Sequence, residues 1–125
     1  MEFPKDYPKS CPPDDATLAD GVVYHLVKPP DLTDPENFVP LARKNPKKWA
    51  QNCQAHGLSV LKSRQAALAA VKQQLFQKRG FTAVASASLT NDRGKIAKTG
   101  GPNHYTWWVA TGIPAHVGFA IIKED

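Results

Sequence analysis

The sequence predicts an α+β fold, a single small domain in which a mostly antiparallel sheet of five to six strands carries one main helix on one face. Three observations lead to this class. The chain has 125 residues, which is the usual size of one domain. Several short apolar segments are separated by turn residues, as is typical of strands. One segment, residues 63–78, combines helix-favouring composition with signals for both helix ends.

The first twenty residues differ in composition from the rest of the chain. They contain four prolines, which exclude a long helix or a central strand. We therefore expect an extended Pro-rich N-terminal arm over residues 1–20, with a short helical turn near 14–19, and a single α+β domain over 21–125. The first strand of that domain is expected at residues 22–27, where nearly every side chain is apolar and alternation places His25 between two valines of one face.

Shorter elements are expected between the first strand and the main helix. Residues 33–41 are interpreted as a short helix or turn, with Thr33 or Asp34 as its N-cap and Pro35 at the first helical position. Residues 43–49 are interpreted as a basic loop that ends in an aromatic residue, and residues 58–62 as a second strand.

The main helix is expected over residues 63–78. Ser63 can cap its N-terminus, and Gly80 lies just beyond its C-terminus. Helical spacing predicts a buried stripe of four apolar side chains: Ala67, Leu68, Val71 and Leu75.

After the helix the period of the pattern changes to two. Strands are expected at residues 81–89, 95–98, 104–110 and 117–123. The turn between the first two is of the longer kind, with Gly94 at a position of positive φ.

Positive charge is concentrated in the middle of the chain. The net charge is +5, yet residues 37–91 contain nine basic side chains and no acidic one. A segment without carboxylates cannot form ion pairs within itself, so its charges face either the acidic N-terminal part or an anionic partner. We expect one contiguous basic patch that contacts such a partner, formed by Arg43, Lys44, Lys47, Lys48, Lys78 and Arg79.

Several common chemistries find little support in the sequence. The lack of carboxylates over residues 37–91 argues against paired-carboxylate hydrolysis and against carboxylate-bound magnesium. No Walker loop, Rossmann glycine motif or nucleophile elbow is present. The chain has neither a secretion signal nor a run of about 18 apolar residues, so we expect a soluble, cytoplasmic protein that contacts no membrane.

The two cysteines are expected to be free thiols in a reducing cytoplasm, because two widely spaced cysteines do not form a disulfide framework. Cys11 and Cys53 could pair only if the fold brought them together. Cys53-x-x-His56 also has the spacing of half a zinc site, which Cys11 with His25 or His104 could complete. A second pair of closely spaced ligands is missing, so no metal is expected.

The stretch over residues 99–110 places two Trp, a His and a Tyr after a Gly-Gly-Pro-Asn turn. Such a strand can form a pocket wall, since rings offer flat surface and polar atoms give direction, but the same composition also suits a plain core strand. His104 in particular either contacts a ligand or bonds a nearby carbonyl and orders the loop. The candidate ligand-binding residues are His25, Ser59, His104, Tyr105 and Trp108.

The order Val-Tyr-His25 in a first strand and Gly57-Leu-Ser59-Val in a second, followed by an Ala-rich helix, resembles the layout of ADP-ribosyl and RNA phosphotransferase-like domains. In that family a His or Arg strand and a Ser strand flank bound NAD. The resemblance implies transfer chemistry with NAD, with His25 and Ser59 beside the cofactor. The family's usual third polar residue, often a Glu, has no equivalent in this chain.

Two classes of function are consistent with these features. The first is a non-catalytic binding or accessory module whose basic central segment engages an anionic partner, which is a nucleic acid, a nucleotide or an acidic protein surface. The alternative is a small NAD-using transferase with His25, Ser59 and His104 around a pocket. The sequence leaves open whether the chain is an enzyme, and it identifies neither a cofactor nor an oligomeric state.

Overall fold

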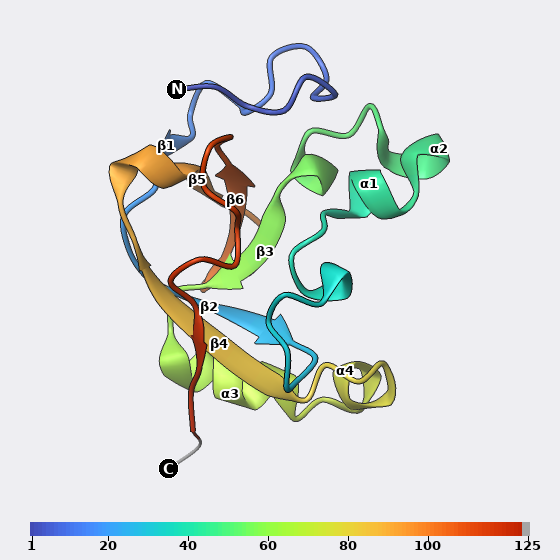
Figure 1. Cartoon of the computed structure of the whole chain (residues 1–125), viewed down its shortest axis with the longest axis vertical. Helices are drawn as coiled ribbons and strands as arrows, with labels where there is room; N and C mark the ends of the chain where they lie inside the picture. Colours follow the sequence, from blue (N-terminus) through green and yellow to red (C-terminus); the bar gives the residue numbers. More distant parts are fainter. Residues whose placement is uncertain (124–125) are drawn as a thin grey trace.

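The computed structural model describes residues 1–123. Its strands form one seven-stranded antiparallel sheet in the order β1-β5-β6-β3-β2-β4-β7 (Figure 1). The strands are β1 (Thr17–Leu18), β2 (Gly21–Val27), β3 (Leu58–Leu61), β4 (Ala83–Leu89), β5 (Gly94–Lys98), β6 (His104–Val109) and β7 (Ala120–Ile121). The α+β class is confirmed, but the expected five to six strands are too few. The additional strand is the two-residue edge strand β1, which is too short to give a periodic signal, and β7 covers only a small part of the strand expected at 117–123.

Strand β2 is paired very differently along its two edges. All of its residues, from Gly21 to Val27, are paired with β4. Toward β3, in contrast, the structure pairs β2 through Tyr24 and Leu61 alone. Figure 1 shows β2 and β3 diverging from this point, so that the sheet opens between them.

The expected main helix is broken into two. Helix α3 spans Arg64–Val71 and helix α4 spans Gln74–Lys78, because Gln73 has extended backbone angles (φ −65°, ψ 137°). Ser63 caps α3 as expected, since its hydroxyl accepts a hydrogen bond from the backbone N–H of Ala66. The break changes the helical phase, so the expectation of a buried Leu75 is wrong: its side chain is 54% exposed, and Phe76 turns inward instead.

The basic segment expected as a loop is helical. It contains α1 (Leu41–Lys44) and α2 (Pro46–Trp49), with Pro46 at the first position of α2, where its missing N–H is not needed. Asn45 caps α2 by accepting from the N–H of Lys48 at 3.4 Å. Three short 3-10 turns complete the helical elements: η1 (Pro35–Asn37), η2 (Gln54–His56) and η3 (Asn91–Arg93). Asp34 caps η1 and Gly94 has a φ of 128°, both as expected.

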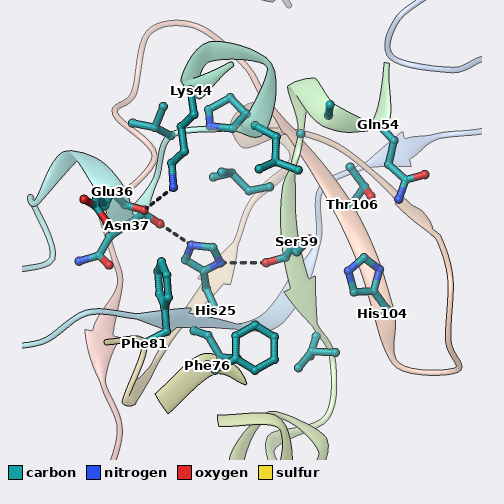
Figure 2. Close-up of a pocket in the computed structure, with 18 of the residues that line it drawn as sticks. His25, Glu36, Asn37, Lys44, Gln54, Ser59, Phe76, Phe81, His104 and Thr106 are labelled. Carbon is teal, nitrogen blue, oxygen red and sulfur yellow. Dashed lines mark hydrogen bonds between the residues drawn. The ribbon is translucent and has the colours of Figure 1, made fainter. Parts of the chain in front are cut away.

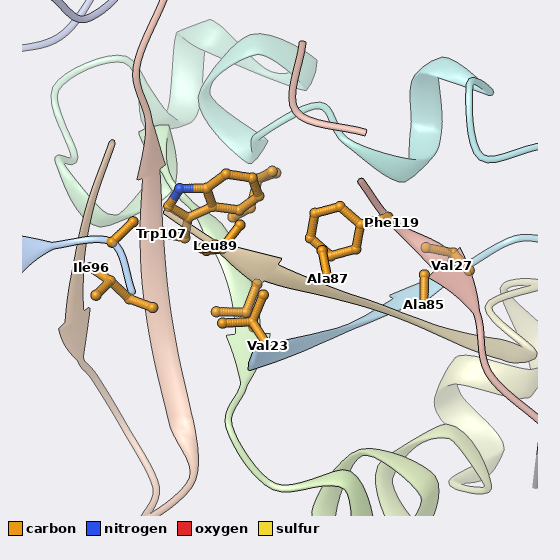
Figure 3. Packing of buried hydrophobic residues seen from close by; sticks show 11 residues of the cluster. Val23, Val27, Ala85, Ala87, Leu89, Ile96, Trp107 and Phe119 are labelled. Carbon is orange, nitrogen blue, oxygen red and sulfur yellow. The ribbon is translucent and has the colours of Figure 1, made fainter. Parts of the chain in front are cut away.

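The core lies on both faces of the sheet. The larger cluster gathers around Trp107, which is fully buried and packs beside Phe119 (Figure 3). The indole N–H of Trp107 donates to the carbonyl of Arg93 at 3.0 Å. On the other face, Ala67 and Val71 of α3 pack against the sheet. The expected helix on one face of the sheet is therefore present as α3.

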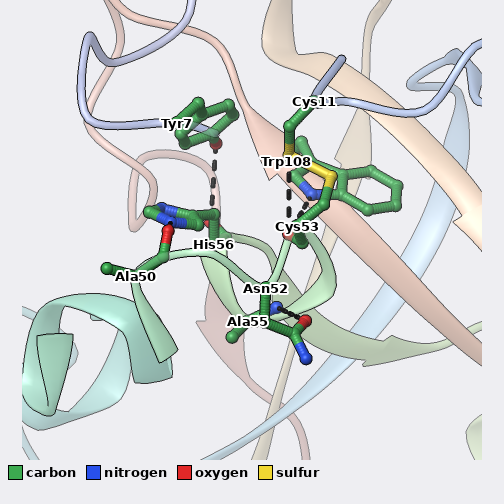
Figure 4. The surroundings of a disulfide bond; sticks show 8 residues. All are labelled: Tyr7, Cys11, Ala50, Asn52, Cys53, Ala55, His56 and Trp108. Atoms are coloured by element: carbon green, nitrogen blue, oxygen red, sulfur yellow. Dashed lines mark hydrogen bonds between the residues drawn. A yellow bond between two sulfur atoms is a disulfide. The ribbon is translucent and has the colours of Figure 1, made fainter. Parts of the chain in front are cut away.

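The N-terminal arm is attached to the body of the molecule. The helical turn expected near residues 14–19 is absent, and β1 pairs with β5 in its place. Cys11 and Cys53 form a disulfide (Figure 4), which corrects the expectation of free thiols. The two cysteines meet because the arm crosses over the start of η2, a contact between distant segments that spacing in the sequence does not reveal.

Candidate functional site

A cleft of about 610 Å³ opens where β2 and β3 separate. Its walls come from β2, β3 and β6 of the sheet and from the segments around α1, η2 and α4. The volume is in the range of small-molecule sites, which are typically about 300–1,000 Å³. The cleft is therefore the first place to look for a ligand.

One end of the cleft combines cations with aromatic rings. Lys44 of α1 and Arg79, which lies just beyond α4, come from separate elements to line it. The Lys44 ammonium lies 6.0 Å from the centre of the Phe81 ring, and the Lys28 ammonium lies 5.2 Å from the same ring. Lys28 is also paired with the Glu36 carboxylate, whereas within residues 1–123 Lys44 donates only to the backbone carbonyl of Glu36, at 3.3 Å.

His25 occupies the middle of the cleft and replaces the missing part of the β2–β3 ladder. Its Nδ1 lies 2.8 Å from the carbonyl oxygen of Ser59 and its Nε2 lies 2.5 Å from that of Asn37 (Figure 2). Burial lowers the pKa of His25, although both carbonyl contacts favour the charged ring. In the neutral ring one nitrogen donates and the other faces a carbonyl without a proton between them.

Asn37 holds this arrangement in place. It is 2% exposed, its side-chain amide donates to the carbonyls of Lys28 and Asp31 at 3.0 Å each, and its amide oxygen accepts from the N–H of Lys28. A buried polar side chain with all these partners is a structural feature. Sequence reasoning missed it, because Asn37 has no local signal beyond its place after the Asp34 cap.

The opposite end of the cleft is polar and uncharged. Ser59 is paired directly with Thr106, and Leu61 with His104, so Ser59, Thr106 and His104 share one face of the sheet. His104 Nδ1 lies 2.8 Å from the carbonyl oxygen of Thr99, and the Thr99 hydroxyl lies 2.8 Å from that of Thr106. Figure 2 shows His104 and Thr106 at the end of the cleft away from Lys44.

Three of the five candidate ligand-binding residues line this cleft, namely His25, Ser59 and His104. Trp108 does not: it is 2% exposed, and its indole N–H donates to the carbonyl of Cys53 at 2.9 Å, beneath the disulfide (Figure 4). Tyr105 lies on the other face of β6, with the Lys62 ammonium 5.1 Å from its ring centre. Of the two roles considered for His104, the structure shows the bond to a nearby carbonyl. The ring also lines the cleft, and contact with a ligand stays a prediction.

The six basic residues expected to form one patch come from the α1–α2 segment and from α4 with the residue that follows it. Lys44 and Arg79 line the cleft. Lys47 and Lys48 are exposed on α2 and Lys78 on α4, and Figure 1 shows these two helices well apart. Arg43 faces a second cavity.

That second cavity, of about 450 Å³, lies between the N-terminal arm and the body of the molecule and is lined by Arg43, Tyr7 and His56. Arg43 is 3.6 Å from the Asp6 carboxylate, and both side chains are half exposed. Burial raises the pKa of Tyr7 to about 12. His56 donates from Nε2 to the carbonyl of Ala50 at 2.8 Å, which also fixes its ring.

The possible zinc site is excluded in the form that the sequence suggested. Cys11 and Cys53 are bonded to each other, so neither offers a thiolate. Within residues 1–123, no group of three or more His, Cys, Asp and Glu side chains is placed to hold a metal ion.

Sequence reasoning also missed the aromatic members of the cleft. Phe76 and Phe81 line it together with Gln54 of η2. Phe76 was missed because one continuous helix over 63–78 places Leu75 rather than Phe76 on the buried face. Phe81 belongs to a segment expected as a strand, whereas the strand begins only at Ala83.

Comparisons with known protein families, with curated proteins and with solved structures found no match to this chain. The resemblance to ADP-ribosyl and RNA phosphotransferase-like domains therefore rests on the layout of His25, Ser59 and the helix alone. Within the described part of the chain, no helix is long and apolar enough to cross a membrane.

Proposed function

We propose that this chain is a binding module for a small phosphate-bearing ligand of the nucleotide class, and that the ligand occupies the cleft between β2 and β3. The observation that carries the proposal is the convergence of Lys44 and Arg79, from separate elements, on one concave site that also contains aromatic rings. Lysine and arginine neutralise phosphate, and rings stack on bases.

The charge balance of the site favours an anion. Arg79 has no side-chain hydrogen bond or ion pair within residues 1–123, and Lys44 contacts only a carbonyl and a ring there. Glu36 is the one carboxylate among the described residues that line the cleft, and Lys28 already neutralises it. A phosphate placed between Lys44 and Arg79 would therefore meet two cations without a competing carboxylate at either.

The shape of the site favours a small ligand over a polymer. A concave cleft of about 610 Å³ suits a mononucleotide or dinucleotide, whereas nucleic acids and acidic proteins generally contact extended basic surfaces. The basic residues on α2 and α4 that lie outside the cleft would serve such extended contacts. Binding of a polymer is accordingly the outcome that would replace this proposal.

The test is calorimetric titration with AMP, ADP, adenosine and inorganic phosphate. We expect ADP and AMP to bind more tightly than adenosine, and Lys44→Gln and Arg79→Gln each to weaken ADP binding about 10- to 100-fold, as loss of a charged hydrogen bond does. Lys47→Gln and Lys78→Gln are matched controls, because each removes one nearby charge outside the cleft. They should leave ADP affinity nearly unchanged.

Two results would overturn the proposal. One is a failure of ADP and AMP to bind the unmodified protein. The other is equal losses in the cleft variants and the matched controls, together with tighter binding of a short oligonucleotide, which would move the contact to the outer basic surface.

A second candidate, the NAD-using transferase, is favoured by one specific observation: His25, Ser59 and His104 all line the cleft. His25 argues in the other direction, since both of its ring nitrogens already contact backbone carbonyls and only the ring surface is left for a cofactor. Release of nicotinamide from NAD, lost in Ser59→Ala, would support the transferase. Binding of NAD without turnover would support the binding module.

The expected cytoplasmic location stays a prediction, and the Cys11–Cys53 disulfide weighs against it, because disulfides persist mainly in oxidising compartments. Counting free thiols in protein isolated from its source under alkylating conditions would decide the point. Two free thiols would indicate a reducing environment.

A further inference from the structure

The two histidines of the cleft differ in how many of their ring nitrogens already contact another group of the protein. His25 uses both nitrogens on backbone carbonyls. His104 uses only Nδ1, which contacts the carbonyl oxygen of Thr99 at 2.8 Å. A carbonyl can only accept, so Nδ1 of the neutral His104 ring carries the proton, and Nε2 carries the lone pair. Within residues 1–123, no group forms a hydrogen bond with His104 Nε2.

The surroundings of His104 hold its ring in this orientation. The Thr99 hydroxyl lies 3.0 Å from Nδ1 and 2.8 Å from the Thr106 hydroxyl, so three side chains are linked. Gly100 adopts a φ of +69°, which turns the loop back on the ring: a Cβ built there would lie 3.7 Å from Nδ1. A histidine fixed through Nδ1 presents Nε2 as an oriented acceptor.

The two ends of the cleft therefore select different chemical groups. A phosphate at the His104 end would face the lone pair of Nε2 in the neutral tautomer, while Lys44 and Arg79 attract it to the other end. The His104 end instead favours a group that donates a hydrogen bond to Nε2. Ser59, on the same face, can both donate and accept, and a ligand hydroxyl group is one group that can bond with both His104 Nε2 and Ser59.

We propose that His104 is a specificity-determining residue that accepts a hydrogen bond at Nε2 from a sugar hydroxyl of the bound ligand, so that the cleft prefers ribonucleotides to their deoxy counterparts. This inference rests on the proposed function, because it takes the phosphate to lie at the Lys44 end. It places the sugar of the same ligand at the His104 end of the cleft.

The experiment compares AMP with 2′-deoxy-AMP and 3′-deoxy-AMP by calorimetry, first on the unmodified protein. At least one of the deoxy forms should bind about 3- to 10-fold more weakly, which is what one neutral hydrogen bond contributes. In His104→Phe, which keeps a ring and removes the acceptor, AMP should fall to the affinity of that deoxy form and the difference should vanish. Lys62→Gln, an exposed change just beyond the end of β3 and outside the cleft, serves as a control that should preserve the difference.

A spectroscopic measurement on the unmodified protein makes the test independent of whether His104→Phe folds. In ¹⁵N-labelled protein the Nε2 resonance of His104 should be that of an unprotonated nitrogen, and AMP should shift it, whereas the weaker deoxy form should not. The inference is overturned if AMP and both deoxy forms bind equally, if the difference persists in folded His104→Phe, or if AMP binds without moving the Nε2 resonance. Failure of all three nucleotides to bind would instead overturn the proposed function, and the inference with it.

Discussion

The two edges of strand β2 show how one sheet can be both a rigid core and an open site. Along β4, every residue of β2 from Gly21 to Val27 has a partner. Along β3, Tyr24 is the residue that the structure pairs, with Leu61. The core cluster includes residues of β2, β4, β3 and β6, whereas the cleft lies at the open edge between β2 and β3.

The difference follows from the side chains at each edge. Along β4, backbone pairing is continuous, and Ala85 and Ala87 are buried in the cluster that contains Trp107. On the other edge the His25 ring reaches across to the carbonyl of Ser59, a position where a continuous ladder would have a backbone N–H. A side chain that substitutes for backbone pairing keeps the strands joined while leaving space between them.

The largest expected effect is the contrast between two leucine truncations, one at each edge. Leu89→Ala on β4 removes a side chain that is 1% exposed, and should lower the free energy of unfolding by about 2–5 kcal/mol through loss of burial and formation of a cavity. Leu61→Ala on β3 changes a half-buried residue of the cleft wall and should lower it by about 1 kcal/mol. Urea denaturation of both variants measures the difference. Equal losses would show that the open edge is as tightly packed as the core.

The next effect concerns the disulfide, which joins the N-terminal arm to the start of η2, a segment that lines the cleft. Cys11→Ser combined with Cys53→Ser opens a loop with a sequence separation of 42 and should lower the free energy of unfolding by about 2–4 kcal/mol. Hydrogen exchange should accelerate most at the amides of His56 and Gly57, which bond back to Cys53 and Gln54 within η2. The amides of β4 serve as the internal control. Uniform acceleration across β4 and η2 would mean that the disulfide stabilises the whole domain without a special role at the cleft.

The sequence predicted the features that depend on neighbouring residues. The Ser63 cap, the Asp34 cap and the positive φ of Gly94 each follow from local backbone requirements, and all three are found. The helix break at Gln73 was not predictable in this way, since the run of helix-favouring residues continues through it.

The site was predictable only in part, for the same reason. The resemblance to a known layout named His25 and Ser59, and the aromatic stretch named His104; all three line one cleft. Alternation placed Trp108 on the face of His104, but whether that face is open depends on the N-terminal arm and its disulfide, which cover Trp108. The absence of β2–β3 pairing beyond Tyr24 in the described chain is likewise a property of the assembled sheet.

A smaller effect tests whether His25 is the group that joins the open edge. Burial lowers the pKa of His25, with Lys44 adding a minor contribution in the same direction, while the carbonyls of Asn37 and Ser59 oppose it. The unfolded chain therefore binds a proton more readily than the folded chain. Stability should be constant above the unfolded pKa of about 6.5 and should fall as the pH decreases below it, toward the lower folded pKa.

The matched variant is His25→Gln, which can still donate to a carbonyl but does not titrate. Urea midpoints of both proteins between about pH 8 and pH 4.5 should converge as the pH falls, because only the unmodified protein loses the contribution of His25; each unit of pKa difference corresponds to about 1.4 kcal/mol. Parallel curves would show that His25 has the same pKa in the folded and unfolded states, and that burial does not lower it.

The smallest expected effect concerns what fixes His104 at the polar end of the cleft. Thr99 contacts His104 Nδ1 twice, through its carbonyl at 2.8 Å and its hydroxyl at 3.0 Å. Thr99→Val removes the hydroxyl and keeps the carbonyl, so the free energy of unfolding should fall by about 0.5–1 kcal/mol, and ¹⁵N spectra should still show the proton on Nδ1. Thr99→Ser, which keeps the hydroxyl and loses a methyl group, is the matched control. A mixture of tautomers in Thr99→Val but not in Thr99→Ser would mean that the hydroxyl, rather than the backbone, orients His104. In that case the two histidines of the cleft would be anchored differently, His25 by backbone carbonyls and His104 by a side chain, whereas retention of the Nδ1 proton makes backbone carbonyls the anchors of both rings.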